Sequence, residues 1–219
     1  MNIFWRGQSC FQIIASPKKN GQVSIVIDPF SEDTGGSLKL PKMEAALLLV
    51  THGHQDHNNV KAISGSPFLI SGPGEYEIKD VFVQGIPAFH DNEHGKERGE
   101  TTIYTIETED IRLCHLGDLG QTELFSEQLE KIGEVDILMA PVGGVYTIDG
   151  KEAVKIISQI EPKITIPMHY YLPKLKYKIE GLDNFLKALG LKSVQPESKL
   201  SIKKKDLSEE EAKIVVLTP

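Results

Sequence analysis

Short apolar runs, rich in β-branched residues and separated by polar turns, fill the first half of the chain. Runs of this kind, bounded by Gly, Pro, Asn or Asp, are typical of β-strands. They predict strands at residues 3–5, 10–14, 23–27, 45–50, 68–70, 81–89, 101–107 and 111–114. The run at 45–50 is apolar at every position, which indicates a strand covered on both faces. A loop at 34–37 and a turn at 72–77 are predicted between these strands.

The second half of the chain alternates helical and strand patterns. Apolar side chains at helical spacing predict amphipathic helices at residues 121–132, 151–160 and 182–189, and Gly190 would end the last of them. Apolar strands are predicted at 135–139, 164–166 and 214–217, a solvated turn at 203–211, and a short helix at 58–64. This order is compatible with two sheets packed face to face, with helices outside.

Composition adds little to this picture. With 219 residues, 40% hydrophobic and 25% charged, and no linker, the chain is predicted to form a single globular domain over 1–219. The two cysteines, Cys10 and Cys114, are too few for a disulfide framework, so reduced buried thiols and a cytoplasmic location are expected. Polar residues interrupt the first ten positions, which disfavours a signal peptide. The aliphatic run at 45–50 is too short to span a membrane.

The formal net charge is −7, from 24 basic and 31 acidic residues. Proteins that bind long nucleic acids carry basic stripes that neutralise phosphates, so no such partner is expected. A small basic pocket for one phosphate stays compatible with this charge.

Three of the seven histidines fall in the segment HGHQDH, directly after the apolar run at 45–50. His52 and His54 lie at i and i+2, so in an extended segment their side chains point to the same side. Asp56 and His57 are adjacent and diverge, so they do not complete the same three-ligand set; a second metal beside the first resolves this. The alternative is a solvated loop, since short motifs carry a false-positive risk.

Three more potential ligands follow predicted strands. His90 ends GIPAFH, His169 follows the apolar run in ITIPMHY, and Asp118 in HLGDLG follows the strand at 111–114. A single strand-end histidine is more often structural than a ligand. Ligands gather beyond the carboxyl ends of strands, however, and together with HGHQDH these three residues indicate a metal site.

HGHQDH, His90, Asp118 and His169 match, in order, the metal motifs of the metallo-β-lactamase superfamily. The stretches WRGQSCF, IDPF, PVGGVYTID and EPKITIPMHY resemble its small-hydrolase branch, which includes the L-ascorbate-6-phosphate lactonases. The likeness covers residues 1–170. It implies an α/β fold, the four-layer αβ/βα sandwich of two mixed β-sheets with helices outside, with the site at one edge between the sheets.

The resemblance also implies a ligand set for two metals. The first metal would be held by His52, His54 and His90, and the second by Asp56, His57 and His169, with Asp118 bridging the two. Asp56 and Asp118 are then the candidate catalytic carboxylates. Many relatives have GHS where this chain has Gly7-Gln8-Ser9, and Gln8 does not titrate, so a proton-carrying role at that position is not expected. No large nuclease-type additional domain is expected, which disfavours RNA cleavage.

Imidazole and carboxylate ligands suit zinc, with manganese or iron as alternatives. Two such ions about 4 Å apart lower the pKa of a bridging water toward ~7, and the resulting hydroxide is the nucleophile. We therefore predict a dinuclear metal-dependent hydrolase of a small ester, lactone or phosphoester. A phosphodiesterase or nuclease, and an inactive metal-binding regulatory protein, are the alternatives.

The polar loop after His90 and the GGVYT segment supply the candidate substrate-binding residues, namely His94, Arg98 and Tyr146. Arg98 or Lys96, the cations of that loop, would hold an anionic group, as an arginine fork does. The favoured alternative for both is an exposed loop charge, and the alternatives are a packing role for Tyr146 and a mobile surface position for His94. His115, three residues before Asp118, is predicted either to support the site or to be structural. Glu75 has no assigned role. The sequence leaves the oligomeric state open.

Overall fold

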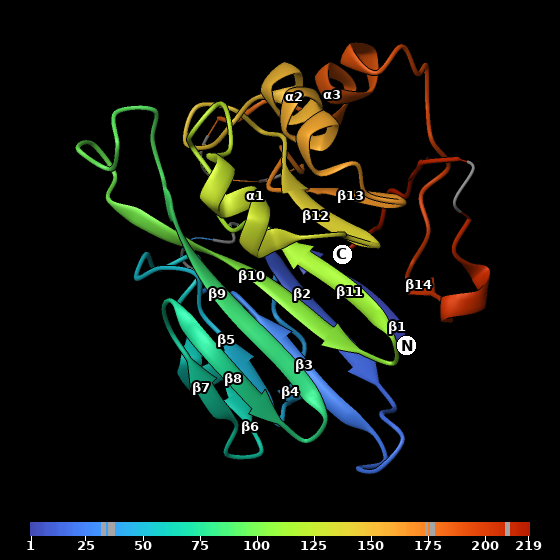
Figure 1. Cartoon of the computed structure of the whole chain (residues 1–219). Coiled ribbons are helices and arrows are strands. Elements are labelled where there is room, and N and C mark those ends of the chain that lie inside the picture. Colours follow the sequence, from blue (N-terminus) through green and yellow to red (C-terminus); the bar gives the residue numbers. More distant parts are fainter. Residues whose placement is uncertain (32–33, 35–37, 174, 176–177, 209–210) are drawn as a thin grey trace.

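The computed structural model describes residues 1–31, 34, 38–173, 175, 178–208 and 211–219. The loop predicted at 34–37 lies outside the described residues except for Thr34. Residues 209 and 210 of the turn predicted at 203–211 also lie outside them. Two β-sheets face each other, and the α-helices gather on one side of the pair (Figure 1).

The first sheet has six strands in the order β14-β1-β2-β3-β5-β7. Their bounds are β1 Asn2–Gly7, β2 Cys10–Ala15, β3 Val23–Ile27, β5 Leu47–Leu49, β7 Phe68–Ile70 and β14 Leu200–Ser201. Strands β1, β2 and β3 form an antiparallel meander, whereas β3, β5 and β7 run parallel. The predicted strands of the first 70 residues are thereby confirmed.

The second sheet has seven strands in the order β15-β13-β12-β11-β10-β9-β8. Their bounds are β8 Gly74–Ile78, β9 Val81–Phe89, β10 Glu100–Thr108, β11 Ile111–His115, β12 Ile137–Pro141, β13 Ile164–Met168 and β15 Lys213–Ile214. Strands β8 to β11 are antiparallel neighbours, and β11, β12, β13 and β15 are parallel. The fold class predicted from the sequence is confirmed.

The main core lies between the two sheets. Because side chains alternate along a strand, Ile25 and Ile27 of β3 join Leu47 and Leu49 of β5 in this core. Val26 and Leu48 face the other way, into a smaller cluster with residues such as Phe30, Met43 and Ile63. All three residues of β5 are buried, as expected of a strand covered on both faces.

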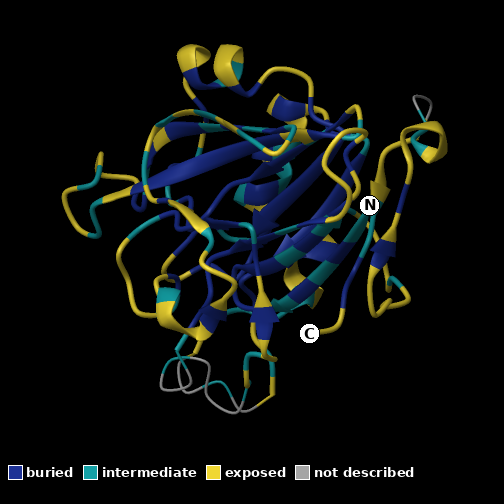
Figure 2. Ribbon diagram, turned by 90° about the horizontal axis from the view of Figure 1, so that it is seen from below, coloured by how far each residue is buried: buried dark blue, intermediate teal, exposed yellow. Residues whose placement is uncertain are grey.

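The three α-helices are α1 Ser126–Ile132, α2 Gly150–Ile160 and α3 Leu182–Ala188, on the outer side of the seven-stranded sheet (Figure 1). In Figure 2 the strands are largely buried, and the exposed residues lie mostly on the loops and turns around them. The side chain of Asp149 accepts the N–H groups of Lys151 and Glu152, a cap that starts α2. Gly190 has φ 73° two residues after α3, which confirms the predicted helix stop.

Several boundaries differ from the prediction. Residues 72–77 were predicted as a turn, but Gly74–Ile78 is strand β8, paired with β9 at the sheet edge. The short helix predicted at 58–64 is a 3-10 turn at Val60–Ala62, followed by β6 Ile63–Ser64, which pairs with β4 Met43–Glu44. Met43 of β4 and Ile63 of β6 pack against Val26 and Leu48 on the outer face of the six-stranded sheet. Within the described residues, no helix has the length and apolarity to cross a bilayer. The single-domain assignment stays a prediction.

Candidate metal centre

The predicted ligands converge because four strands from two sheets end at the same edge. The HGHQDH segment follows β5, His90 directly follows β9, Asp118 lies three residues after β11, and His169 directly follows β13. The carboxyl ends of parallel strands meet at one edge of a sheet, so a ligand after each strand is brought into one place. This matches the arrangement expected from the strand-end positions.

His52, His54 and His90 form the first group of potential ligand atoms, all within 4.8 Å of one another. The Nε2 atom of His52 lies 3.0 Å from Nδ1 of His54. The segment is a series of bends and turns, not an extended strand, yet both rings face the same point. His90 is buried and His54 is exposed, so the group is open to solvent on one side.

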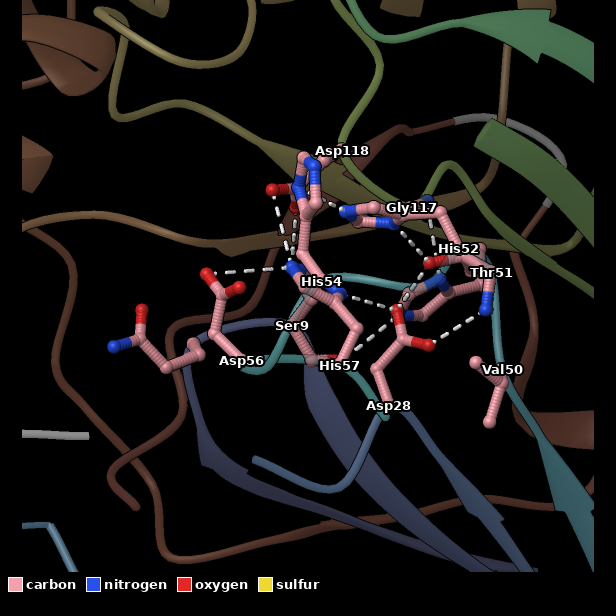
Figure 3. Close-up of polar contacts among 12 residues, drawn as sticks. Ser9, Asp28, Val50, Thr51, His52, His54, Asp56, His57, Gly117 and Asp118 are labelled. Carbon is pink, nitrogen blue, oxygen red and sulfur yellow. Dashed lines mark hydrogen bonds and ion pairs between the residues drawn. The ribbon is translucent and has the colours of Figure 1, made fainter. Parts of the chain in front are cut away.

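Asp56, His57, Asp118 and His169 form the second group, again within 4.8 Å of one another. Oδ2 of Asp118 lies 3.1 Å from Nε2 of His57 and 3.4 Å from Nε2 of His169. The same oxygen lies 3.7 Å from Nε2 of His90, a member of the first group. Asp118 therefore stands between the two groups, where a bridging ligand would lie (Figure 3).

The donor set fits divalent metal ions. His57 is fully buried, and its Nε2 has no hydrogen-bond partner among the described residues, although it faces Asp56 and Asp118. A buried polar atom without a partner is costly, and a metal ion would remove that cost. Imidazoles and carboxylates are the ligands that zinc and similar ions take. The two groups together would hold two ions.

The electrostatics of the cluster also favour a cation. Burial disfavours a charged His57, but the carboxylates of Asp118 and Asp28 raise the pKa of His57 well above its usual value. Burial likewise opposes an ionised Asp118, yet His169 and His57 hold the pKa of Asp118 well below its usual range. Burial lowers the pKa of His52 to about 3, which keeps that ring in the neutral form that binds metals.

Asp28 is a candidate site residue that the sequence interpretation missed. Its Oδ2 lies 2.9 Å from Nδ1 of His57 and accepts the hydroxyl of Thr51 at 2.7 Å, while its Oδ1 accepts the N–H of Thr51 at 2.8 Å (Figure 3). A carboxylate on the far nitrogen of a ligating imidazole fixes its orientation. Asp28 directly follows β3, so the strand-end rule used for His90 and His169 was the signal that pointed to it.

Ser9 and His115 hold the loop of Asp118. The Ser9 hydroxyl donates to Oδ1 of Asp118 at 2.9 Å. Nδ1 of His115 accepts the N–H of Gly117 at 3.1 Å, so Nε2 carries the proton and donates to the carbonyl of Ser9 at 2.9 Å. Burial lowers the pKa of His115, in agreement with this neutral ring. Of the two interpretations left open for His115, support of the site is favoured.

A cavity of about 350 Å³ opens over the cluster. Its walls are formed by Thr34, His54, Asp56, His90, Arg98, Asp118, Tyr146 and His169. The guanidinium carbon of Arg98 lies 5.7 Å from the centre of the Tyr146 ring. Two of the three candidate substrate-binding residues are thus placed at the cavity.

The third candidate, His94, is placed elsewhere. Its backbone has φ 58°, and its ring stacks on Phe125 at 6.3 Å with an interplanar angle of 8°. It lines a separate pocket of about 90 Å³. In this structure the turn directs the His94 side chain away from the cluster, so its predicted direct role stays a prediction that this placement does not support. Glu75 lies exposed on β8 beside Gln84, also away from it.

Comparison with known proteins agrees with this geometry. Residues 2–169 match the family model described as the beta-lactamase superfamily domain. A UPF0173 metal-dependent hydrolase of Staphylothermus marinus is 32% identical over 196 residues, which covers 77% of this chain and 82% of the relative. A second UPF0173 metal-dependent hydrolase, from Thermococcus onnurineus, is 28% identical over 189 residues. The match covers 75% of this chain and 82% of that relative.

Solved structures are similar over the whole chain. A Thermotoga maritima protein, named as a candidate Zn-dependent hydrolase of the metallo-β-lactamase superfamily, aligns with a TM-score of 0.78 and 32% identity. The alignment covers 100% of this chain and 99% of that one. The finer resemblance to lactonases stays a prediction. From the family match and these relatives, the chain belongs to the metallo-β-lactamase superfamily, among its UPF0173 metal-dependent hydrolases.

Proposed function

We propose that this protein is a dinuclear metal-dependent hydrolase of a small ester, lactone or phosphoester. One observation carries the proposal: Oδ2 of Asp118 lies within 3.7 Å of imidazole nitrogens from both ligand groups. A carboxylate in that position is suited to bridge two cations. The relatives named as metal-dependent hydrolases support the same assignment.

Two divalent ions, zinc first with manganese or iron as alternatives, would supply an activated water and a Lewis acid at this centre. The chain's own residues hold the ligands in place. Asp28 orients His57, and Ser9 donates to Asp118, so neither ligand is free to rotate away. Asp118 would also accept a hydrogen bond from the attacking water and so orient it.

The cavity supports a small-molecule substrate. Its volume of about 350 Å³ lies at the lower end of the range for small-ligand sites. The net charge of −7 disfavours a long nucleic acid as substrate. Cys10 and Cys114 are both buried and unpaired, which supports a reducing, cytoplasmic compartment.

Metal content and turnover test the proposal together. Elemental analysis of protein purified without added metal or chelator is expected to give about two zinc or manganese ions per chain. A panel of lactones, carboxylic esters and bis-p-nitrophenyl phosphate should then contain a substrate whose hydrolysis stops on chelation and returns with metal. Iron would favour redox chemistry instead. Bound metal without turnover on any panel member would favour an inactive metal-binding protein, and no uptake of metal would contradict the centre itself.

A further inference from the structure

The loop between β9 and β10 is built around one buried carboxylate, that of Asp91, which is 3% exposed. This side chain accepts the backbone N–H groups of four residues of its own loop: Glu93 at 2.8 Å, Gly95 at 2.8 Å, Glu97 at 3.0 Å and Arg98 at 2.8 Å. Hydrogen bonds to an ionised carboxylate are stronger than those between neutral groups, so these four bonds fix the conformation of the loop.

Both ends of this loop are tied to the candidate ligand His90. Asp91 is the next residue along the chain, and the N–H of His90 donates to the carbonyl of Gly99 at 3.0 Å. The N–H of Gly99 in turn donates to the carbonyl of Gly95 at 3.0 Å. Backbone hydrogen bonds therefore hold this loop in a fixed position relative to the candidate ligand His90.

The loop brings Arg98 to the wall of the cavity. Its side chain is 33% exposed and lies over the Tyr146 ring, which supports a guanidinium from one face. Its ion pair with Glu97 spans 3.4 Å at an exposed position, where such pairs are weak. Among the described residues that line the cavity, Arg98 is the cationic side chain outside the histidine cluster. Lys96, in the same loop, is exposed and does not line it.

We propose that Arg98 is the specificity-determining residue for an anionic substrate, and that Asp91 is the residue that positions it. The substrate would carry a carboxylate or phosphate group separate from the bond that is hydrolysed. This inference rests on the proposed function, because it assigns the substrate class of the same site. A small molecule that fills the cavity would reach the ligand cluster with one end and Arg98 with the other.

The charge pattern supports this class. A guanidinium binds carboxylate and phosphate oxygens through paired N–H donors. Two divalent ions held by two carboxylates would leave the cavity positive, and Arg98 adds to that charge at its wall. A neutral substrate of the same shape would leave this guanidinium partly desolvated and without an ionic partner, which is a basis for discrimination.

Binding of linear carboxylates to the metal-loaded protein tests the inference without relying on turnover. The probes are the dicarboxylates from malonate to adipate, each compared by calorimetry with the monocarboxylate of the same chain length. One end would bind at the metal centre, and the second end of a matching length would reach Arg98. The best dicarboxylate is expected to bind roughly tenfold more tightly than its monocarboxylate.

Arg98→Ala should abolish this preference, because it weakens dicarboxylate binding more than monocarboxylate binding. Lys96→Ala is the matched control, with the same loss of charge in the same loop, and should keep the preference. Arg98→Lys keeps the charge but not the paired N–H donors, so its preference for the dicarboxylate should be intermediate. This variant also keeps the test possible if Arg98→Ala misfolds.

Asp91→Asn tests the positioning role. It removes one strong acceptor from the loop, so the preference for the dicarboxylate over its monocarboxylate should fall. The control Glu93→Gln alters an exposed acid in the same loop and should leave this preference unchanged. A purely structural role of Asp91 would lower stability without moving the preference.

The inference is overturned if no dicarboxylate exceeds its monocarboxylate, or if Arg98→Ala and Lys96→Ala weaken binding equally. Failure of the proposed function has a different signature, namely no metal uptake or no hydrolysis on the panel. If the protein shows the dicarboxylate preference but no turnover, the anion-binding role of Arg98 stands and the hydrolase proposal fails.

Discussion

The two ends of the parallel strands β11, β12 and β13 carry two different cavities. At the carboxyl ends lies the candidate metal centre, with a cavity of about 350 Å³. At the amino ends lies a larger cavity of about 550 Å³, lined by charged residues that include Arg112, Asp136, Lys163 and Lys204. Size alone would place the function at the amino end.

The two cavities differ in how their polar groups are paired. At the amino end, Asp136 contacts the amines of Lys163 at 3.1 Å and Lys204 at 2.9 Å and accepts the N–H of Arg112 at 3.0 Å. One buried nitrogen there, Nε of Arg112, lacks a hydrogen-bond partner within the described part of the chain, but the rest of that guanidinium is held by Lys131 and Glu107.

At the carboxyl end, the buried Nε2 of His57 faces Asp56 and Asp118 and has no hydrogen-bond partner among the described residues. In His90 and His169 the unpartnered nitrogen is Nδ1, while Nε2 of each ring faces Asp118. A charge network that satisfies itself has little left for a ligand, whereas unpaired buried groups call for one. The contrast therefore favours the smaller cavity as the functional one.

The largest effect should come from Asp118→Ala at the carboxyl end. This variant removes the oxygen that faces imidazoles of both ligand groups, so hydrolysis should fall more than about a hundredfold, with loss of at least one metal per chain. The fold should persist, as judged by circular dichroism. Retained full activity would mean that the cavity at the carboxyl ends of the strands is not the functional one.

A smaller loss is expected for Asp28→Asn. The amide keeps the shape of the side chain but loses the charge that holds His57 and Thr51. Metal affinity or activity should drop about ten- to a hundredfold, as found for partners of ligating histidines. Metal titration followed by assays at saturating metal separates the two effects. No change in either would show that the orientation of His57 does not depend on Asp28.

Asp136→Asn at the amino end should leave the activity of the metal-loaded protein unchanged and lower the free energy of unfolding by about 1 kcal/mol. Burial opposes the charge, but the N–H of Arg112 and the amines of Lys204 and Lys163 hold the pKa of Asp136 below its usual value.

The depressed pKa sets the sign of the pH dependence. The contribution of Asp136 is complete above the unfolded-state pKa of about 4 and is lost as the pH falls through the folded-state value. Denaturant unfolding at pH 7 and in acid should therefore show a difference from the native protein that shrinks on acidification. A loss of activity at pH 7 instead would mean that the two ends are coupled.

The ligand cluster could be predicted from the sequence because its members follow the ends of apolar strands. His90 and His169 directly follow apolar strands, and strand direction then decides where their side chains meet. The same regularity predicted most strands and the end of α3 at Gly190. The spacing of apolar residues and the ends of strands depend on the local sequence, so both could be predicted without the tertiary structure.

The loops did not follow from such signals. His94 and Arg98 belong to one polar loop and were assigned the same role, yet only Arg98 reaches the cavity. The difference depends on the four hydrogen bonds to Asp91, which no periodicity predicts. Strand β8 was missed because Gly72, Pro73 and Gly74 resemble a turn, and its side chains are only partly buried at the sheet edge.

More than half of the chain lies between His52 and His169, the outermost members of the ligand set. During synthesis the HGHQDH segment emerges long before β13, so an early metal would meet only the imidazoles and carboxylate of one short peptide. The complete set exists only after the two sheets have docked, because its members follow strands of both. Complete metal capture is therefore expected late in biogenesis, and full loading would report that β13 has reached its place.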